Sequence, residues 1–336
     1  MKRKLLSVSV ILVLLLTMLS ACSKDTAETK AEETKKETKA ETAKTETTGE
    51  TEAKESEGGN YKIGFAVSTL ANEFFVEMKD AAEAKAADMG IELVVLDAQD
   101  STETQATQVE DLITQKVDLI ILNPVDSDAI GTSVIAANEA KIPVITVTRP
   151  SNSGEVVQHL DIDNKEAGAL IAGQLMKDLD NKGKVAVLEG ISGAPSSVDR
   201  QSGFVDKLKA DAPDIEVVTS LTANYSRDEG ATVTEDILQA NPELDAIYAH
   251  NDEMALGAVR AIEAAGRQDE IKVYGIDAVA DALEALKTGE MAATVQQQPD
   301  LQIQTALESA VKVLKGENVE KLVNIPLKLL TKADVE

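Results

Sequence analysis

Short runs of β-branched and aliphatic residues alternate with longer amphipathic segments along most of this chain. The runs KIGFAV, ELVVLD, DLIILN and PVITVT come first, and KVAVLE, IEVVTS, AIYAH, IKVYGID and AATVQQ follow. Between them lie segments with helical periodicity, such as TQATQVEDLITQ, SDAIGTSVIAANEA and NKEAGALIAGQLMKDL. Strand, helix and strand at this spacing predict right-handed βαβ units, and therefore parallel sheets with helices on both faces.

The number of predicted strands favours two sheets over one. Two series of four or five strands divide near Asp161 to Asp163. The chain from Asn60 to Glu336 is long enough for two domains of ordinary size. We therefore expect an α/β protein with two doubly wound, Rossmann-like lobes, each built on a parallel sheet.

The first 22 residues, MKRKLLSVSVILVLLLTMLSAC, combine three consecutive basic residues, an apolar run from Leu5 and small residues before a cysteine. That order is typical of an export signal, and the run is short for a membrane span. Leu-Ser-Ala-Cys resembles the lipobox of bacterial lipoproteins, which implies cleavage before Cys22 and acylation of its thiol. Since Cys22 is the only cysteine, an intrachain disulfide and a Cys-based metal site are excluded.

Residues 23–59 are nearly all Glu, Lys, Thr and Ala, with no large apolar side chain. Such a segment buries too little surface to offset its ordering entropy, so we predict a disordered tether. The chain has a formal net charge of −26, most of which comes from the residues after the tether. A domain this acidic is repelled by phosphate backbones and anionic lipid heads, so nucleic acid is not an expected partner.

Polar and aromatic side chains recur just after the predicted strands. Open parallel sheets bind ligands beyond the carboxyl ends of their strands, so these positions are candidates for a binding site. They are Ser68, Asn72, Phe74, Phe75, Thr148, Arg149, Arg200, Tyr225, Asn251, Asp277 and Gln297. The set consists mainly of planar amides, guanidinium groups, one carboxylate and flat rings.

Such a set suits a carbohydrate. Adjacent sugar hydroxyls both donate and accept hydrogen bonds, and Arg, Asp, Asn and Gln side chains can each hold two of them. The C–H faces of a sugar ring are apolar and pack on aromatic planes. We expect one or both of Phe74 and Phe75 to form a wall of a polyol pocket; the alternative is that they only pack between helix and sheet.

Each candidate position also has a purely structural interpretation. Asp277 and Asn251 are suited to capping the helices that follow them. Arg149, which precedes a proline, would fit an exposed turn, and Arg200 would fit the solvated face of a helix. Their recurrence at one topological place favours a binding site.

Five segments resemble, in order and spacing, the ribose-binding-protein-like family that supplies sugar ABC transporters: VSTLANEFFVEMKDAAEAKA, LNPVDSDAIG, IPVITVTRPSNSGEVVQH, HNDEMALGAVRA and AATVQQQPD. The resemblance covers nearly the whole chain from about Tyr61. It implies two lobes joined by three crossing strands, with sugar in the cleft. The implied N-terminal lobe spans residues 60–162 plus about 298–324, and the C-terminal lobe residues 163–297 plus about 325–336. It also implies that the strand-end residues above, together with Ile276, contact the ligand.

Two positions depart from that family's pattern. Thr148 stands where an aspartate precedes the first pocket arginine, and Ile276 stands where a phenylalanine precedes the later pocket aspartate. Tyr225 replaces another phenylalanine, which keeps a ring but adds a hydroxyl. The matched positions then hold two arginines against one carboxylate. We therefore expect a monosaccharide other than D-ribose, such as a hexose, a ketose or an acidic sugar; the alternative is that water replaces the missing aspartate and ribose still binds.

The resemblance implies a lipid-anchored sugar-binding protein on the extracytoplasmic face of the cell membrane of a Gram-positive bacterium. It would act as a monomer that delivers a monosaccharide to an ABC permease, without enzymatic activity, cofactor or metal. A sensor that presents bound sugar to a membrane receptor or sensor kinase is the alternative.

Other classes find less support in the sequence. A secreted α/β hydrolase would need a Gly-x-Ser-x-Gly elbow, which is absent, and a histidine base, for which His159 and His250 have no evident Ser or Cys partner. Neither a Gly-x-Gly-x-x-Gly nor a Walker loop indicates a nucleotide site. DNA-binding repressors with this core need a helix-turn-helix where this chain has a signal and a tether.

Overall fold

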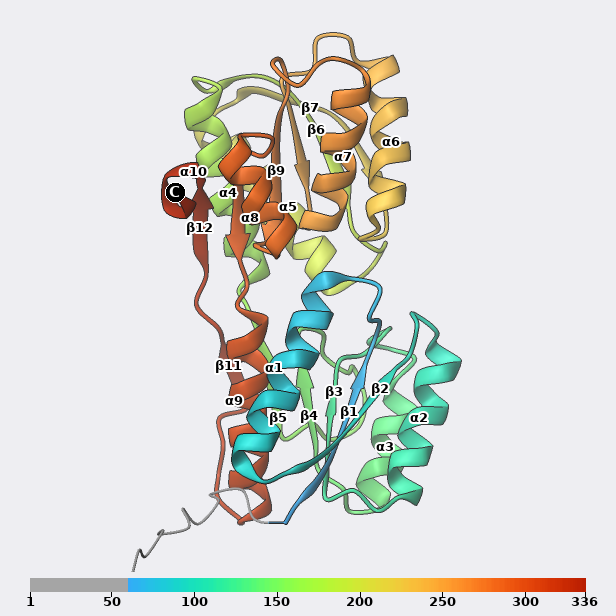
Figure 1. The fold of residues 1–336 in the computed structure, drawn as a ribbon. Helices are drawn as coiled ribbons and strands as arrows, with labels where there is room; N and C mark the ends of the chain where they lie inside the picture. The colour runs from blue at the N-terminus through green and yellow to red at the C-terminus, as the bar shows by residue number, and fades with distance from the viewer. Residues whose placement is uncertain (1–59) are drawn as a thin grey trace, which may run out of the picture. The chain divides into compact units, whose positions relative to one another are not determined.

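The computed structural model describes residues 60–336, which form two α/β lobes, each built on a six-stranded sheet (Figure 1). The predicted signal segment, Cys22 and the predicted tether lie outside the described residues. No helix within residues 60–336 has the length and apolar character needed to cross a membrane.

The first sheet has the strand order β11-β5-β4-β3-β1-β2, and all its pairings are parallel. Its strands are β1 (Lys62–Val67), β2 (Glu92–Asp97), β3 (Leu119–Leu122), β4 (Val144–Val147), β5 (Gln158–Asp161) and β11 (Leu322–Asn324). Its helices are α1 (Glu73–Met89), α2 (Thr102–Thr114), α3 (Gly131–Glu139) and α9 (Pro299–Leu314). Helix α1 packs against α9, and α2 packs against α3.

The second sheet has the strand order β12-β10-β9-β8-β6-β7, in which only the pairing of β10 with β12 is antiparallel. Its strands are β6 (Lys182–Glu189), β7 (Asp214–Thr222), β8 (Ala246–Ala249), β9 (Lys272–Asp277), β10 (Ala293–Gln296) and β12 (Lys328–Thr331). Its helices are α4 (Asn164–Asp178), α5 (Pro195–Asp211), α6 (Arg227–Ala240), α7 (Asp252–Ala264), α8 (Ala280–Thr288) and the short α10 (Lys332–Val335). The pairs α4 with α5 and α6 with α7 pack together.

The buried strands read as continuous apolar runs because helices cover both faces of each sheet. Side chains alternate between the two faces. In β1, Ile63 and Phe65 pack in the core under α1 and α9, whereas Ala66 packs with residues of α2 and α3. In β3, Ile121 and Ile120 divide between the two layers in the same way.

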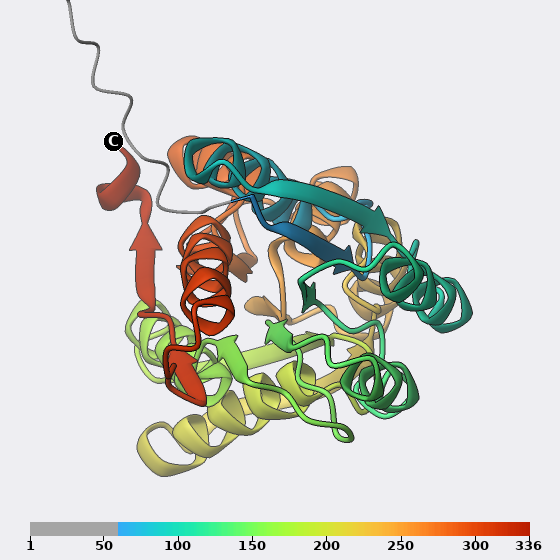
Figure 2. The same cartoon turned by 90° about the horizontal axis from the view of Figure 1, so that it is seen from below.

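Within residues 60–336 the chain passes between the lobes three times: from β5 to α4, from β10 to α9 and from β11 to β12. The C-terminal segments α9 and β11 therefore belong with the first sheet, and Figure 2 shows these red elements among the elements of that lobe. The prediction of two doubly wound α/β lobes is confirmed.

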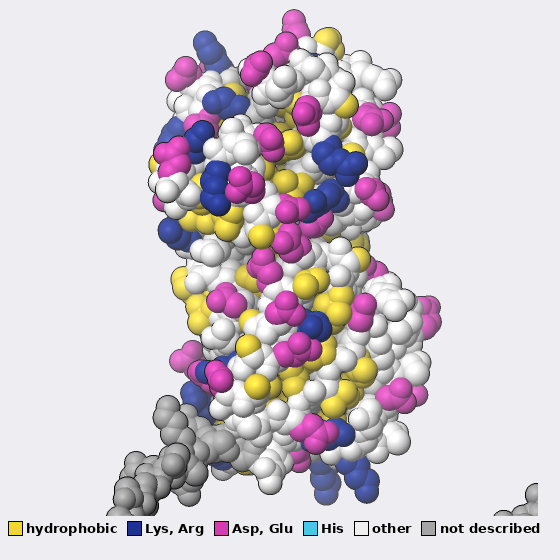
Figure 3. All heavy atoms as spheres, viewed as in Figure 1, with side chains coloured by type: hydrophobic (Ala, Val, Ile, Leu, Met, Phe, Trp, Pro, Cys, Tyr) yellow, Lys and Arg dark blue, Asp and Glu magenta, His cyan; other side chains and the backbone are white. Residues whose placement is uncertain are grey.

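Acidic side chains spread over both lobes on the face shown in Figure 3.

Candidate ligand-binding site

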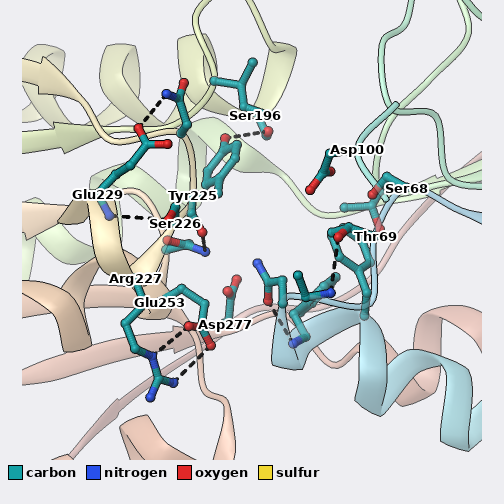
Figure 4. A pocket seen from close by; sticks show the side chains of 18 of the residues that line it. Ser68, Thr69, Asp100, Ser196, Tyr225, Ser226, Arg227, Glu229, Glu253 and Asp277 are labelled. Carbon is teal, nitrogen blue, oxygen red and sulfur yellow. Dashed lines mark hydrogen bonds and ion pairs between the residues drawn. The ribbon is translucent and has the colours of Figure 1, made fainter. Parts of the chain in front are cut away.

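A cavity of about 660 Å³ is lined by residues from both lobes (Figure 4). All of the predicted ligand-contacting residues except Ile276 line it: Ser68, Asn72, Phe74, Phe75, Thr148, Arg149, Arg200, Tyr225, Asn251, Asp277 and Gln297. Most of them stand at or just after the carboxyl ends of parallel strands, as expected for a doubly wound fold.

Ile276 is placed differently from the expectation. It is fully buried and packs with Tyr274 and Phe204 in the apolar core of the second lobe. Side chains alternate along β9, so Asp277 turns toward the cavity while Ile276 turns toward the core. The structure corrects the assignment of Ile276 to the pocket, because its side chain lies in the core and does not line the cavity.

Phe74 and Phe75 lie in the first turn of α1, whose N-cap Asn72 accepts a hydrogen bond from Phe74 N at 3.0 Å. The two rings contact each other edge to face, with centroids 5.1 Å apart. Both side chains line the cavity and both also belong to the core under α1. The capped helix therefore holds an aromatic wall whose far side is packed against the sheet.

Arg149 is buried, not part of an exposed turn. Its Nη1 donates to the backbone oxygen of Pro124 and, at 2.8 Å, to that of Val125. Burial lowers the pKa of the guanidinium, while Tyr225 and Asp100 act in the opposite direction. Loop carbonyls thus fix the orientation of Arg149 at the wall of the cavity.

Arg200 in α5 is also buried. Its Nε donates to Asn164 Oδ1 at 2.9 Å, and its Nη1 donates to the backbone oxygen of His250 at 2.6 Å. Burial and the nearby Arg200 charge lower the pKa of His250 to about 3, so the imidazole is neutral. Its Nδ1 accepts a hydrogen bond from Gly190 N at 3.2 Å. His250 therefore has a structural role: its backbone oxygen holds Arg200, and its ring holds the Gly190 backbone.

Asp277 ends β9 with a backbone φ of 141°, and its side chain accepts a hydrogen bond from Gln297 Nε2. It does not cap α8, whose N-cap position is Val279. Burial, with the neighbouring Asp252, raises the pKa of the Asp277 carboxyl, and Arg200 opposes this shift. Asp277 and Gln297 thus form a linked pair on the second lobe.

Two side-chain oxygens on the cavity wall are buried without a hydrogen-bond partner: Ser68 Oγ and Gln297 Oε1. Buried polar atoms are nearly always satisfied in folded proteins. One of these atoms belongs to the first lobe and the other to the end of β10 in the second. Both residues line the cavity, each from its own lobe.

Asn251 both caps a helix and lines the cavity. Its Oδ1 caps α7 by accepting from Met254 N at 3.0 Å, and its Nδ2 donates to the backbone oxygen of Tyr225 at 3.4 Å. The Tyr225 hydroxyl forms a hydrogen bond with Ser196 Oγ at 2.8 Å. A side chain at Gly190 would collide with the Tyr225 ring, so only glycine leaves room for the ring at this place.

The structure adds lining residues that the sequence did not single out: Thr69, Ala71, Asp100, Ile191, Ser196, Asn224, Ser226, Arg227, Asp228, Glu229 and Glu253. Asp100 follows β2, so the strand-end rule applied to ELVVLD would have found it. Arg227 pairs with both oxygens of Glu253, at 2.7 and 3.1 Å, and with Asp281 at 2.8 Å. These contacts depend on tertiary packing, which no local pattern reveals.

Among residues 60–336, His, Cys, Asp and Glu side chains form no group of three or more that would hold a metal ion.

Comparison with known proteins agrees with this geometry. The family model described as periplasmic binding protein domain matches residues 63–318, and the chain belongs to this family. The ribose import binding protein RbsB of Bacillus subtilis is 40% identical over 328 residues, which cover 97% of this chain and 98% of that protein.

Two solved structures extend the comparison. A periplasmic solute-binding protein of an ABC transporter from Actinobacillus succinogenes, with bound D-allose, has a TM-score of 0.79 and 34% identity, covering 82% of this chain and 99% of the other. An ABC transporter solute-binding protein from Bacillus halodurans, with bound myo-inositol, has a TM-score of 0.78 and 36% identity, covering 83% and 96%.

Proposed function

We propose that this protein is an extracytoplasmic solute-binding protein that captures a monosaccharide or a closely related polyol and delivers it to an ABC importer. The observation that carries the proposal is the cavity between the lobes, which amide, guanidinium, carboxylate and aromatic side chains of both lobes line. A polyol offers hydroxyls that both donate and accept, which suits these side chains. The ligands of the related proteins are of the same chemical class.

Capture in this proposal requires groups from both lobes. The first lobe supplies the Phe74 and Phe75 rings and Arg149, and the second supplies Arg200 and Asp277. A ligand that contacts both lobes only when they close stabilises the closed arrangement by its differential affinity for that state. The ABC permease would then recognise the closed protein. The chain carries out no covalent chemistry in this scheme.

The proposal extends to the anchor. The lipobox-like sequence ending at Cys22 would attach the mature protein to the outer face of the cytoplasmic membrane, as in Gram-positive bacteria. The acidic tether of residues 23–59 would separate the lobes from the membrane surface. The folded part would act as a monomer.

A thermal-shift screen tests the proposed function. The protein is unfolded and refolded to remove carried-over ligand, and then heated with pentoses, hexoses, cyclic polyols and sugar acids. A ligand that binds only the folded state adds RT ln(1 + [L]/Kd) to the free energy of unfolding and so raises the melting temperature. We expect a rise with one or a few sugars; no shift with any member at millimolar concentration would contradict the proposal.

A further inference from the structure

Asp100 occupies a fixed position on the wall of the cavity. It lies in the turn after β2, where Gln99 and Asp100 both have left-handed backbones with φ of 53° and 57°. The turn is held by Gln99 N, which donates to Asp97 Oδ1 at 2.9 Å, and by Asp100 N, which donates to Ser68 O at 2.8 Å. Asp100 is thereby tied to Ser68, the residue that follows the neighbouring strand β1.

The Asp100 carboxylate is available to a ligand. Figure 4 shows it directed into the space between Tyr225 and the Ser68–Thr69 segment. Burial raises the pKa of the Asp100 carboxyl, and the neighbouring Thr69 and Arg149 act in the opposite direction. A carboxylate has about four acceptor sites, so most of its capacity remains for other donors. Asp100 is exposed at the cavity surface, where such donors can reach it.

Thr148 does not provide this acceptor. Its hydroxyl donates to Gln302 Oε1 at 3.2 Å, a contact within the protein. Arg149, which follows it, donates to the backbone oxygens of Pro124 and Val125, and Asp100 lines the same cavity. The guanidinium is therefore held by carbonyl groups of its own lobe, and a carboxylate of that lobe stands on the same cavity.

Acidic side chains outnumber basic ones in the lining of the cavity. Arg227 is paired with Glu253 and Asp281. The other charged lining residues are Arg149 and Asp100 on the first lobe and Arg200, Asp228, Glu229 and Asp277 on the second, so the lining holds five acidic residues against three arginines.

We propose that Asp100 contacts the ligand and determines specificity: it accepts hydroxyls from an uncharged monosaccharide or cyclic polyol and excludes sugar acids. This inference rests on the proposed function. Because acidic residues outnumber arginines in the lining, and Arg149 and Arg200 already donate to protein oxygens, a ligand carboxylate would enter a cavity of net negative charge. Like charges at a desolvated site are strongly unfavourable.

The test is calorimetry on matched neutral and acidic sugars. The panel contains D-ribose, D-allose, D-glucose, D-galactose and myo-inositol, together with D-glucuronate and D-galacturonate. The variants are Asp100→Asn, Asp100→Ala and the control Glu110→Gln, which removes the same charge from an exposed position of α2. Melting temperatures show that each variant is folded.

We expect the wild type to bind its best neutral sugar and to reject both uronates. Asp100→Asn should weaken neutral-sugar binding by about 10- to 100-fold and raise uronate binding relative to the matching hexose by about tenfold or more. Glu110→Gln should change neither. The Asp100→Ala variant separates the loss of the acceptor from any contact made by the asparagine amide.

Two results would overturn the inference and leave the proposed function standing. One is wild-type binding of a uronate as tight as that of its hexose. The other is neutral-sugar affinity and selectivity within about twofold of wild type in both Asp100 variants. Binding of no sugar by the wild type would overturn the proposed function and this inference with it.

Discussion

Thr148 Oγ1 donates a hydrogen bond to Gln302 Oε1 at 3.2 Å. Gln302 Nε2 in turn donates to the backbone oxygen of Gln297 at 3.0 Å. The contacts link the loop after β4 in the first lobe, through α9, to the residue that follows β10 in the second lobe. The Thr148 hydroxyl thus joins the wall of the cavity to one of the passages between the lobes.

Replacing Thr148 tests whether this position sets the preference for ribose. Thr148→Asp introduces the residue type found before the pocket arginine in ribose-binding relatives, and aspartate tolerates the left-handed backbone here, where φ is 65°. We expect calorimetry to show D-ribose binding near the millimolar range in the wild type and at least about tenfold tighter in the variant. Thr148→Val is the control, because it removes the hydrogen bond to Gln302 without adding a carboxylate. Sub-micromolar binding of D-ribose by the wild type would contradict the altered-specificity hypothesis.

The two buried arginines should each be necessary for tight binding. Removing a hydrogen-bonded charged partner from a desolvated site typically costs about 2 to 5 kcal/mol of binding free energy. We expect losses in this range for Arg149→Ala and Arg200→Ala, measured by calorimetry with the best sugar of the screen. Arg260→Ala, which removes an exposed arginine of α7, should bind as the wild type does.

Both arginines also hold backbone carbonyls, so their truncation is expected to lower stability as well. The Lys variants separate the two effects, because they keep the charge but lose the planar fork of donors. We expect Arg149→Lys and Arg200→Lys to stay folded at the assay temperature and still lose affinity. A folded variant with near wild-type affinity would mean that the cleft is misplaced.

Asp252 should make the stability of the protein depend on pH. Burial raises the pKa of its carboxyl to about 7. The hydrogen bonds from Thr294 Oγ1 and from the Ala278 and Val279 backbone N–H groups act in the opposite direction and lower the pKa. The unfolded chain releases this proton near the ordinary value of 3.8, whereas the folded protein holds it to about 7. The contribution of Asp252 to the free energy of unfolding is therefore complete below pH 3.8 and is lost as the pH rises to about 7.

Denaturant titrations from pH 4.5 to 8 measure this effect. We expect the free energy of unfolding of the wild type to fall, relative to that of Asp252→Asn, by up to about 1.4 kcal/mol per pH unit within the window. Loss of the hydrogen bonds in the variant lowers its stability at every pH, so the difference in slope is the test. Parallel curves for the two proteins would show that Asp252 is ionised throughout.

The lipobox-like sequence predicts that Cys22 anchors the protein. Cys22→Ala should leave the protein unprocessed or release it into the medium, because the thiol that receives the lipid is missing. Detergent phase partitioning of the wild type and the variant, expressed in a Gram-positive host, measures the difference. Equal partitioning of the two proteins would rule out the lipoprotein assignment. Sugar binding by the released protein should be unchanged.

Most of the fold followed from the hydrophobic pattern. Each of the nine apolar runs corresponds to a strand, from KIGFAV at β1 to AATVQQ at β10. The strands β5, β11 and β12 were missed. These three strands are short and contain polar residues such as Gln158 and Lys328. The strands lie beside the passages between the lobes, where one face of the sheet is less covered, so their sequences lack a continuous apolar run.

The site was predictable where a single rule sufficed. The carboxyl-end rule for parallel sheets placed residues such as Arg149 and Asp277 on the cavity. Ile276 entered the predicted site through the comparison with the family's pattern, and that assignment failed because neighbouring strand residues face opposite sides. Asp100 was missed because the segment after ELVVLD has the composition of a turn with a cap, and Ser101 indeed caps α2. The Thr148–Gln302 contact joins residues far apart in sequence, which no local pattern indicates.

Isothermal titration of the refolded wild-type protein with the panel of neutral monosaccharides and myo-inositol tests the central claim most directly. The account predicts that at least one uncharged member binds with a Kd of about 1 μM or less, at one site per chain, and that this binding is lost in Arg149→Ala and in Arg200→Ala. Binding of every member weaker than about 1 mM, or tight binding that survives both substitutions, would contradict capture of a sugar between the two lobes.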